Sequence, residues 1–306
     1  MRKLVLVVLV GVLATAAVAA PAQVTERVRV ASAGGQLTKG FPAGVFVWIV
    51  SPPAYARASL AGDGGRWVGP RYAATGDGTV GGDTSISWSL RFAQAKDAVA
   101  AANSSLAKGW PVDLRGGISV PHVIGGRTVG TILGHYVLTA PPGDRPAAYE
   151  LAVAFAVGPG VFALLRYELP DPVSDDAGAA GSYVVNGLPA SVWNRGQALW
   201  AMTSLELHGT LPPTRVSARV APDGRVVRGT VGDAFRHPVV RARVALQRLT
   251  GSAWRTVAST RTDKHGVYAL RGIATRGRYR TVATLGSAAV RSSSVVAGPM
   301  TSRTKA

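Results

Sequence analysis

The C-terminal third of the chain constrains the fold most, because short apolar runs recur there between turn-forming residues. Seven runs have the composition of β-strands: 215–220, 226–231, 242–249, 254–262, 267–270, 279–285 and 290–296. Turn sequences such as Pro222-Asp223-Gly224 and Asp263-Lys264-His265-Gly266 separate them. Strand-like runs with turn signals about every ten residues predict an all-β sandwich.

Arginines in this region alternate with apolar residues. Arg241 and Arg243 flank Ala242, and Arg278 and Arg280 flank Tyr279. Successive side chains of a strand point to opposite faces, so each pair is predicted to point outward together. We interpret these four arginines as candidate binding residues. A solvated sheet face that binds nothing is the alternative interpretation.

The charge of the chain is concentrated in the same region. The whole chain has 34 Lys/Arg and 16 Asp/Glu, a net charge of +18, but residues 211–306 hold 18 of the basic residues and only three acidic ones. A region this basic predicts anionic partners: a cell-wall polymer, a polysaccharide or a membrane surface. Specific nucleic-acid binding is not expected, because aromatic residues do not interleave with the arginines as in known motifs.

Three motifs in this region resemble secreted bacterial immunoglobulin-like modules of the carboxypeptidase-regulatory type. They are P-V-x-x-A-x-V-x-L-x within 238–248, W-x-x-V-A at 254–258 and T-D-x-x-G-x-Y at 262–268. The resemblance implies an immunoglobulin-like sandwich over residues 212–300, acting as an adhesion or spacer module, and it implies no catalytic residues.

Residues 21–211 are predicted to form a separate α+β domain that ends at the proline-containing linker 209–213. We expect helices over 93–108 and 191–206, the second capped by Ser191, with an antiparallel meander between them. Gly125-Gly126 predicts a hairpin turn, and the Gly- and Ser-rich stretch 51–87 predicts long loops with short strands. The pattern of helix, meander and closing helix is similar to the PsbP/Mog1-like α/β sandwich.

Residues 1–20 have the features of an export signal. Met1-Arg2-Lys3 precede an apolar run, and small residues before Pro21 fit a cleavage site. Retention as a membrane anchor stays open, as does the oligomeric state. The chain has no cysteine, which excludes disulfides and thiolate metal sites. Residues 301–306 are expected to be a disordered tail.

The sequence contains no recognisable catalytic constellation, so we expect a non-enzymatic protein without cofactor or metal. His122 and His135 could approach each other across the hairpin, but two imidazoles do not complete a zinc site. Glu150 and Glu168 are interpreted as edge charges rather than a glycosidase pair. The acidic groups Asp63/Asp77/Asp83 and Asp171/Asp175/Asp176 lack calcium-loop spacing.

The aromatic residues at 193 and 200 give a further candidate site. Trp193 and Trp200 are seven residues apart on the expected second helix and share one of its faces. Core packing explains them best, and an aromatic groove with Arg195 at its rim is the functional alternative.

From these observations we predict an exported binding or adhesion protein of the cell envelope. The alternative is an exported hydrolase in which His135 and Glu150 converge.

Overall fold

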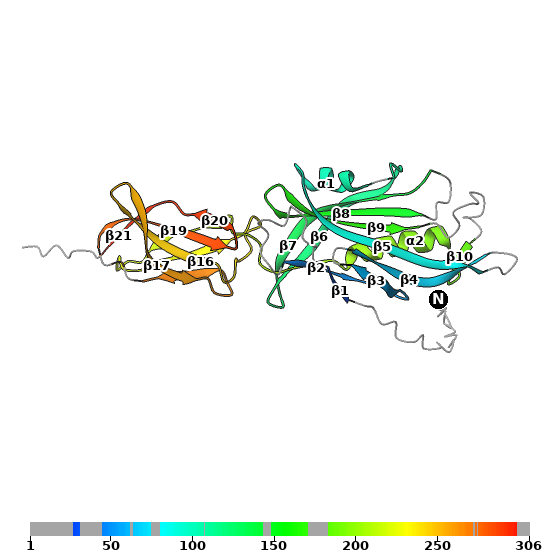
Figure 1. Cartoon of the computed structure of the whole chain (residues 1–306), viewed down its shortest axis with the longest axis horizontal. Helices are drawn as coiled ribbons and strands as arrows, with labels where there is room; N and C mark the ends of the chain where they lie inside the picture. Colours follow the sequence, from blue (N-terminus) through cyan, green and yellow to red (C-terminus); the bar gives the residue numbers. More distant parts are fainter. Residues whose placement is uncertain are drawn as a thin grey trace, which may run out of the picture.

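The computed structural model describes residues 27–30, 45–61, 64–74, 80–106, 108–142, 148–170, 183–271, 273 and 275–298. Two β-rich regions follow each other along the chain (Figure 1). We call them the large-sheet region, residues 27–208, and the C-terminal region, residues 215–298.

The large-sheet region contains twelve strands and two helices, with these bounds: β1 Arg27–Val30, β2 Phe46–Val50, β3 Ala56–Ala61, β4 Gly64–Ala74, β5 Val80–Gln94, α1 Ala98–Ser105, β6 Val112–Ile124, β7 Arg127–Thr139, β8 Tyr149–Gly158, β9 Val161–Leu169, β10 Tyr183–Val185, β11 Leu188–Pro189, α2 Ala190–Thr203 and β12 Glu206–His208.

These twelve strands form one mixed sheet. Its order is β1-β2-β12-β6-β7-β8-β9-β5-β4-β10-β11, and β3 pairs with β4. Every pairing is antiparallel except that of β12 with β6. The sheet curls, and the two helices lie on its opposite faces (Figure 1). Because both faces of its centre are covered, β8 is buried along almost its whole length.

The C-terminal region contains nine short strands: β13 Arg215–Val216, β14 Arg219–Val220, β15 Val227–Gly232, β16 Arg243–Thr250, β17 Ala253–Arg261, β18 Val267–Leu270, β19 Gly277–Leu285, β20 Ala288–Arg291 and β21 Val295–Ala297. Strands β13, β14 and β18 pair with β15, and strands β17, β16, β19, β20 and β21 make a second sheet. Inward residues of both sheets, including Val227, Leu246, Tyr268 and Tyr279, share one core.

The predicted fold class, an α+β domain followed by an immunoglobulin-like sandwich, is wrong. The chain is predominantly β throughout, and its largest element is the curled mixed sheet rather than a helix-and-meander layer. In the C-terminal region, two predicted strands are each broken in two. The 215–220 run bends where the Ser217 carbonyl lies so close to Gly229 that a Cβ there would be 1.9 Å from the oxygen.

The prediction of long loops over 51–87 is wrong, because glycine in a strand and glycine in a loop are alike in composition. Strands β3, β4 and much of β5 occupy it. A Cβ at Gly65 would lie 2.7 Å from the Trp88 ring, and one at Gly69 would lie 2.7 Å from the Tyr55 ring. These glycines therefore allow aromatic side chains to pack onto the strand.

Both helices are shorter than predicted. Helix α1 begins after Asp97, whose carboxylate accepts a hydrogen bond from the Ala100 amide, because β5 continues to Gln94. Helix α2 follows Pro189 and has no side-chain cap, so Ser191 does not have the predicted capping role. The Gly125-Gly126 hairpin is present, with both glycines at positive φ.

Several predictions fall outside the described residues: the signal at 1–20, the tail at 301–306, and the acidic residues Asp63, Asp77, Asp171, Asp175 and Asp176. In the part of the chain that is described, neither helix has the length and apolar character needed to cross a membrane.

Candidate functional site

The outer face of the five-stranded C-terminal sheet gathers five arginines. Strand registers place Arg243 directly opposite Arg261, and the same side of the neighbouring strands holds Arg278, Arg280 and Arg291. Alternate residues of these strands, such as Val244 and Ala283, face the core. We call Arg243, Arg261, Arg278, Arg280 and Arg291 the arginine face.

The arginine face has no acidic counterpart. Asp223, Asp233 and Asp263 are the acidic residues of the described C-terminal region, and each has a carboxylate oxygen bonded to backbone amides of its own loop. Among the described residues, no arginine or lysine of this region forms a salt bridge.

Further like-charge pairs occur on neighbouring strands. Arg219 lies opposite Arg228 in the four-stranded sheet, and Arg248 lies opposite Arg255. Like charges at directly opposed positions destabilise a sheet. The C-terminal region therefore carries electrostatic repulsion that its own side chains do not neutralise.

Three of the four arginines predicted from the sequence belong to the arginine face. The guanidinium of Arg280 lies 4.3 Å from the centroid of the Trp254 ring and donates to the Gln247 side chain. Arg278 donates to Ser294 at 3.2 Å. Arg241 does not share the predicted strand geometry, because it lies in a turn before β16 with a φ of 60°.

A buried histidine cluster lies at the junction of the two regions. His122 on β6 contacts His237 from the β15–β16 loop, with 2.8 Å between their Nδ1 atoms. Asp233 completes the cluster: its Oδ2 lies 3.9 Å from Nδ1 of His122 and 3.6 Å from Nδ1 of His237. All three residues are buried.

Neighbouring backbone groups orient two members of the cluster. Nε2 of His122 lies 2.8 Å from the Gly209 carbonyl oxygen, which only accepts hydrogen bonds, so this nitrogen carries the proton. Oδ1 of Asp233 accepts from the amides of Phe235 and His237, whereas its Oδ2 is buried without a hydrogen-bond partner. Burial lowers the pKa of His122, which favours the neutral ring with a lone pair on Nδ1.

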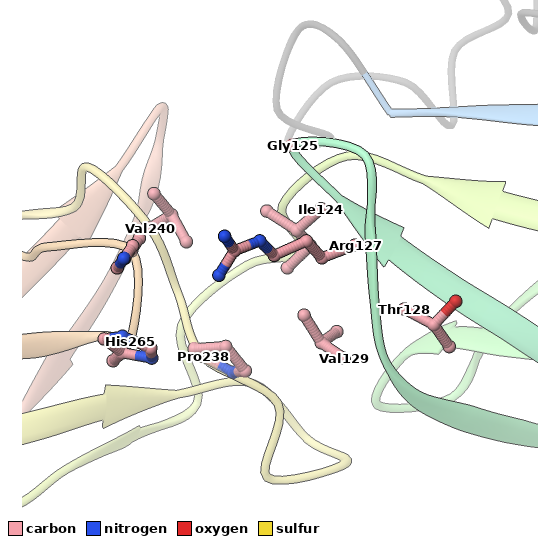
Figure 2. A pocket seen from close by; sticks show the side chains of 9 residues that line it. Ile124, Gly125, Arg127, Thr128, Val129, Pro238, Val240 and His265 are labelled. Atoms are coloured by element: carbon pink, nitrogen blue, oxygen red, sulfur yellow. The ribbon is translucent and has the colours of Figure 1, made fainter.

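A pocket of about 510 Å³ lies next to this cluster, between the two regions (Figure 2). The β6–β7 hairpin contributes Ile124 and Arg127 to one wall, and Pro238, Val240 and His265 form the opposite wall. The lining combines apolar residues such as Val129 and Val240 with the cationic side chains of Arg127 and Lys264.

The residues of α2 for which an aromatic groove was the alternative to core packing make contacts with the core and the sheet. Trp193 packs against the core and donates to the Tyr55 hydroxyl at 3.2 Å. Arg195 donates to Asp113 of β6 at 2.8 Å, and this contact raises the pKa of Arg195. Trp200 is half-buried. These contacts stabilise the packing of α2 against the sheet.

The two glutamates considered as a glycosidase pair lie directly opposite each other on β8 and β9. Arg166 lies between them and forms ion pairs with both, and Glu150 also accepts from the Lys108 amide. The prediction that Glu150 is an edge charge is wrong, because Glu150 is fully buried on the face covered by α1. A guanidinium shared by both carboxylates indicates a structural ion-pair group.

The histidine predictions also need correction. His122 pairs with Gly130, which puts His135 on the opposite face of the hairpin, so the two imidazoles do not meet. His135 and Glu150 share a face of β7 and β8 but are four residues apart in register, a separation of about 13 Å. They do not form a catalytic pair in this arrangement.

Sequence reasoning missed the pairing of His122 with Asp233 and His237, which lie more than 100 positions further along the chain. Asp233 and His237 are spaced i, i+4 in a loop, a pattern with no distinctive signal of its own. No protein-family model and no curated protein matches this chain.

Proposed function

We propose that the protein is a non-enzymatic binding protein whose arginine face holds an anionic polymer of the cell envelope. The observation that carries the proposal is Arg243 directly opposite Arg261 on a sheet face with no acidic residue. Export through residues 1–20 is part of the proposal, because it would bring the protein to such polymers.

The arginines of the face repel one another. A like-charge cross-strand pair costs a few tenths of a kcal/mol up to about 1 kcal/mol relative to a neutral pair. A bound polyanion removes this cost and gains charge-assisted hydrogen bonds, because guanidinium groups bind phosphate, sulfate and carboxylate through several donors. The arginine face is therefore stabilised only when an anion is bound to it.

The shape of the face favours an extended polymer over a small anion. Arg243 and Arg261 lie on paired strands toward one end of β19, and Arg278 lies toward the other end of that strand. Repeated charges along a flexible polymer can follow such a row. Trp254, under Arg280, adds an aromatic surface at the same face.

The test measures binding of the intact protein to immobilised polyphosphate over a range of salt concentrations. We expect Arg243→Gln/Arg261→Gln to weaken binding at least tenfold at low salt and to reduce the slope of log affinity against log salt by about two. The matched control is Arg91→Gln/Arg115→Gln, which removes the same charge from exposed positions of the large sheet.

Equal losses in both double variants would refute a specific role for the arginine face and leave only net charge. Binding to vesicles containing phosphatidylglycerol, without binding to polyphosphate or dextran sulfate, would identify a membrane surface and overturn the polymer proposal. Neutral dextran should bind neither variant nor the unmodified protein.

A further inference from the structure

We propose that His122, Asp233 and His237 form a binding site for one divalent transition-metal ion of the zinc class. The ion would join the large-sheet region to the C-terminal region, because His122 belongs to the first and the other two residues to the second. This site is separate from the arginine face and does not depend on the proposed function.

The first support is the spacing of the three candidate ligand atoms. Nδ1 of His122, Nδ1 of His237 and Oδ2 of Asp233 are separated by 2.8, 3.9 and 3.6 Å. A point equidistant from all three lies about 2.0 Å from each, which equals the usual zinc–nitrogen and zinc–oxygen bond length. A tetrahedral arrangement needs all three separations to be roughly 3.3 Å, so the two nitrogens must move apart by about half an ångström and Oδ2 must move about 0.3–0.6 Å closer to them.

The second support is the orientation of His122. Its Nε2–H donates to the Gly209 carbonyl, and this leaves the lone pair of Nδ1 directed at the other two residues. Metal-binding histidines commonly donate their second ring nitrogen to a backbone carbonyl or carboxylate, which fixes the tautomer and the ring. His122 therefore has the outer contact that a metal ligand requires.

The third support is the unpartnered carboxylate oxygen. Asp233 is 1% exposed, and its Oδ2 has no hydrogen-bond partner although Oδ1 has two. A buried carboxylate oxygen without a partner is costly. A hydrogen bond between the two imidazoles alone leaves this oxygen unsatisfied, whereas a metal ion bonds to all three atoms.

The chemistry of the donors selects the class of ion. Two imidazoles and one carboxylate suit zinc and related first-row metals. Calcium and magnesium require six or more oxygen ligands or several retained waters, so this set is a poor match for them. With three protein ligands, the fourth position of a tetrahedral ion would be taken by water.

The surrounding backbone makes room for the cluster. A Cβ on Gly130 of β7 would lie 2.3 Å from Nε2 of His237, so the imidazole occupies its place only because residue 130 is glycine. Gly130→Ala would thus displace a ligand without removing it. This variant therefore tests the position of the His237 imidazole while all three ligand side chains are kept.

The test uses the intact protein, stripped with a chelator and dialysed against zinc and, separately, cobalt. We expect one equivalent of bound metal per chain and the intense visible absorption of tetrahedral Co²⁺. Asp233→Asn and His237→Gln should each lower zinc affinity at least tenfold, because even the loss of an outer-shell partner of a ligand typically costs about tenfold or more. Gly130→Ala should also weaken binding.

The matched control is His265→Gln, an exposed histidine of the neighbouring pocket that is outside the cluster. It should bind zinc like the unmodified protein. Metal binding that survives Asp233→Asn, or that is lost in His265→Gln, would overturn the site. If the variants fail to fold, the Co²⁺ titration of the unmodified protein tests the proposal by itself. Absence of one equivalent of bound Co²⁺ with tetrahedral absorption would refute the site.

Discussion

The two regions of the molecule use arginine in opposite ways. In the large-sheet region, arginines pair with acids: Arg71 with Asp83 at 3.1 Å, Arg195 with Asp113 at 2.8 Å, and Arg166 with two glutamates. In the C-terminal region, arginines face other arginines across strand pairs. The excess charge of the chain is therefore a property of the C-terminal region, over both of its sheets.

The same contrast separates arginines with a structural role from those for which we propose a binding role. A guanidinium that already holds a carboxylate has little to offer an external anion, and its removal leaves a partner unsatisfied. A guanidinium opposed by another one has a charge that its neighbour does not neutralise, and its removal relieves repulsion. Substitutions of paired arginines in the large-sheet region and of opposed arginines in the C-terminal region should therefore change the free energy of unfolding in opposite directions.

The largest effect is expected for the buried acid of the large sheet. Glu150→Ala removes a fully buried partner of Arg166 and should lower the free energy of unfolding by about 3 kcal/mol. Asp83→Ala is the control, because the Arg71–Asp83 pair is exposed and is expected to contribute about 1 kcal/mol or less. Urea unfolding of both variants measures the difference, and equal losses would contradict the distinction between buried and exposed pairs.

The second effect concerns the junction between the two regions. Zinc at a hundred times its dissociation constant should stabilise the folded protein by about 2.7 kcal/mol, provided that it does not bind the unfolded chain. Asp233→Asn should remove this increment and His265→Gln should keep it. Thermal unfolding with zinc and with a chelator measures the effect, and an increment that persists in Asp233→Asn would count against a site at the junction.

The sequence predicted the strands better than their assembly. The runs 242–249, 254–262 and 279–285 match β16, β17 and β19 closely, because alternation of side chains is a local signal. Gly64 and Gly65 of the large sheet allow Trp88 to approach closely, and a lone sequence does not distinguish such glycines from loop glycines.

The arginine face and the histidine cluster also differed in how well the sequence predicted them. Arg243, Arg278 and Arg280 could be found from the alternating pattern of one strand or hairpin. The pairing of His122 with Asp233 and His237 could not, because it depends on how β6 meets the β15–β16 loop of the other region. Sites made within one hairpin leave a pattern in the sequence, whereas sites made between distant segments do not.

The third effect tests the opposite use of arginine directly. Arg261→Gln should raise the free energy of unfolding by about 0.2–1 kcal/mol at low salt, because it relieves the repulsion with Arg243. Arg71→Gln, on the large sheet, should be neutral or slightly destabilising. Salt should shrink the gain for Arg261→Gln, since screening weakens exposed charges. A loss of stability in Arg261→Gln would break the comparison.

The smallest effect concerns an acid of the C-terminal region that is held by the backbone rather than by arginine. The amide of Val267, followed by that of His265, lowers the pKa of Asp263 by donating to its carboxylate. A lowered folded-state pKa gives stability that is fully present above the unfolded value, and it is lost as the pH falls through the folded value. Asp263→Ala should therefore be less stable than the unmodified protein at neutral pH.

The gap between Asp263→Ala and the unmodified protein should narrow as the solution is acidified below the ordinary aspartate range. Asp263→Asn is the control, because it keeps a neutral acceptor: its gap to the unmodified protein should be smaller at neutral pH, and it should narrow on acidification as the Asp263→Ala gap does, since neither variant titrates at position 263. Urea unfolding at several pH values measures both gaps. A gap that stays constant under acidification would show that the turn depends on the shape of the side chain alone, and that backbone amides do not replace the missing arginine partner.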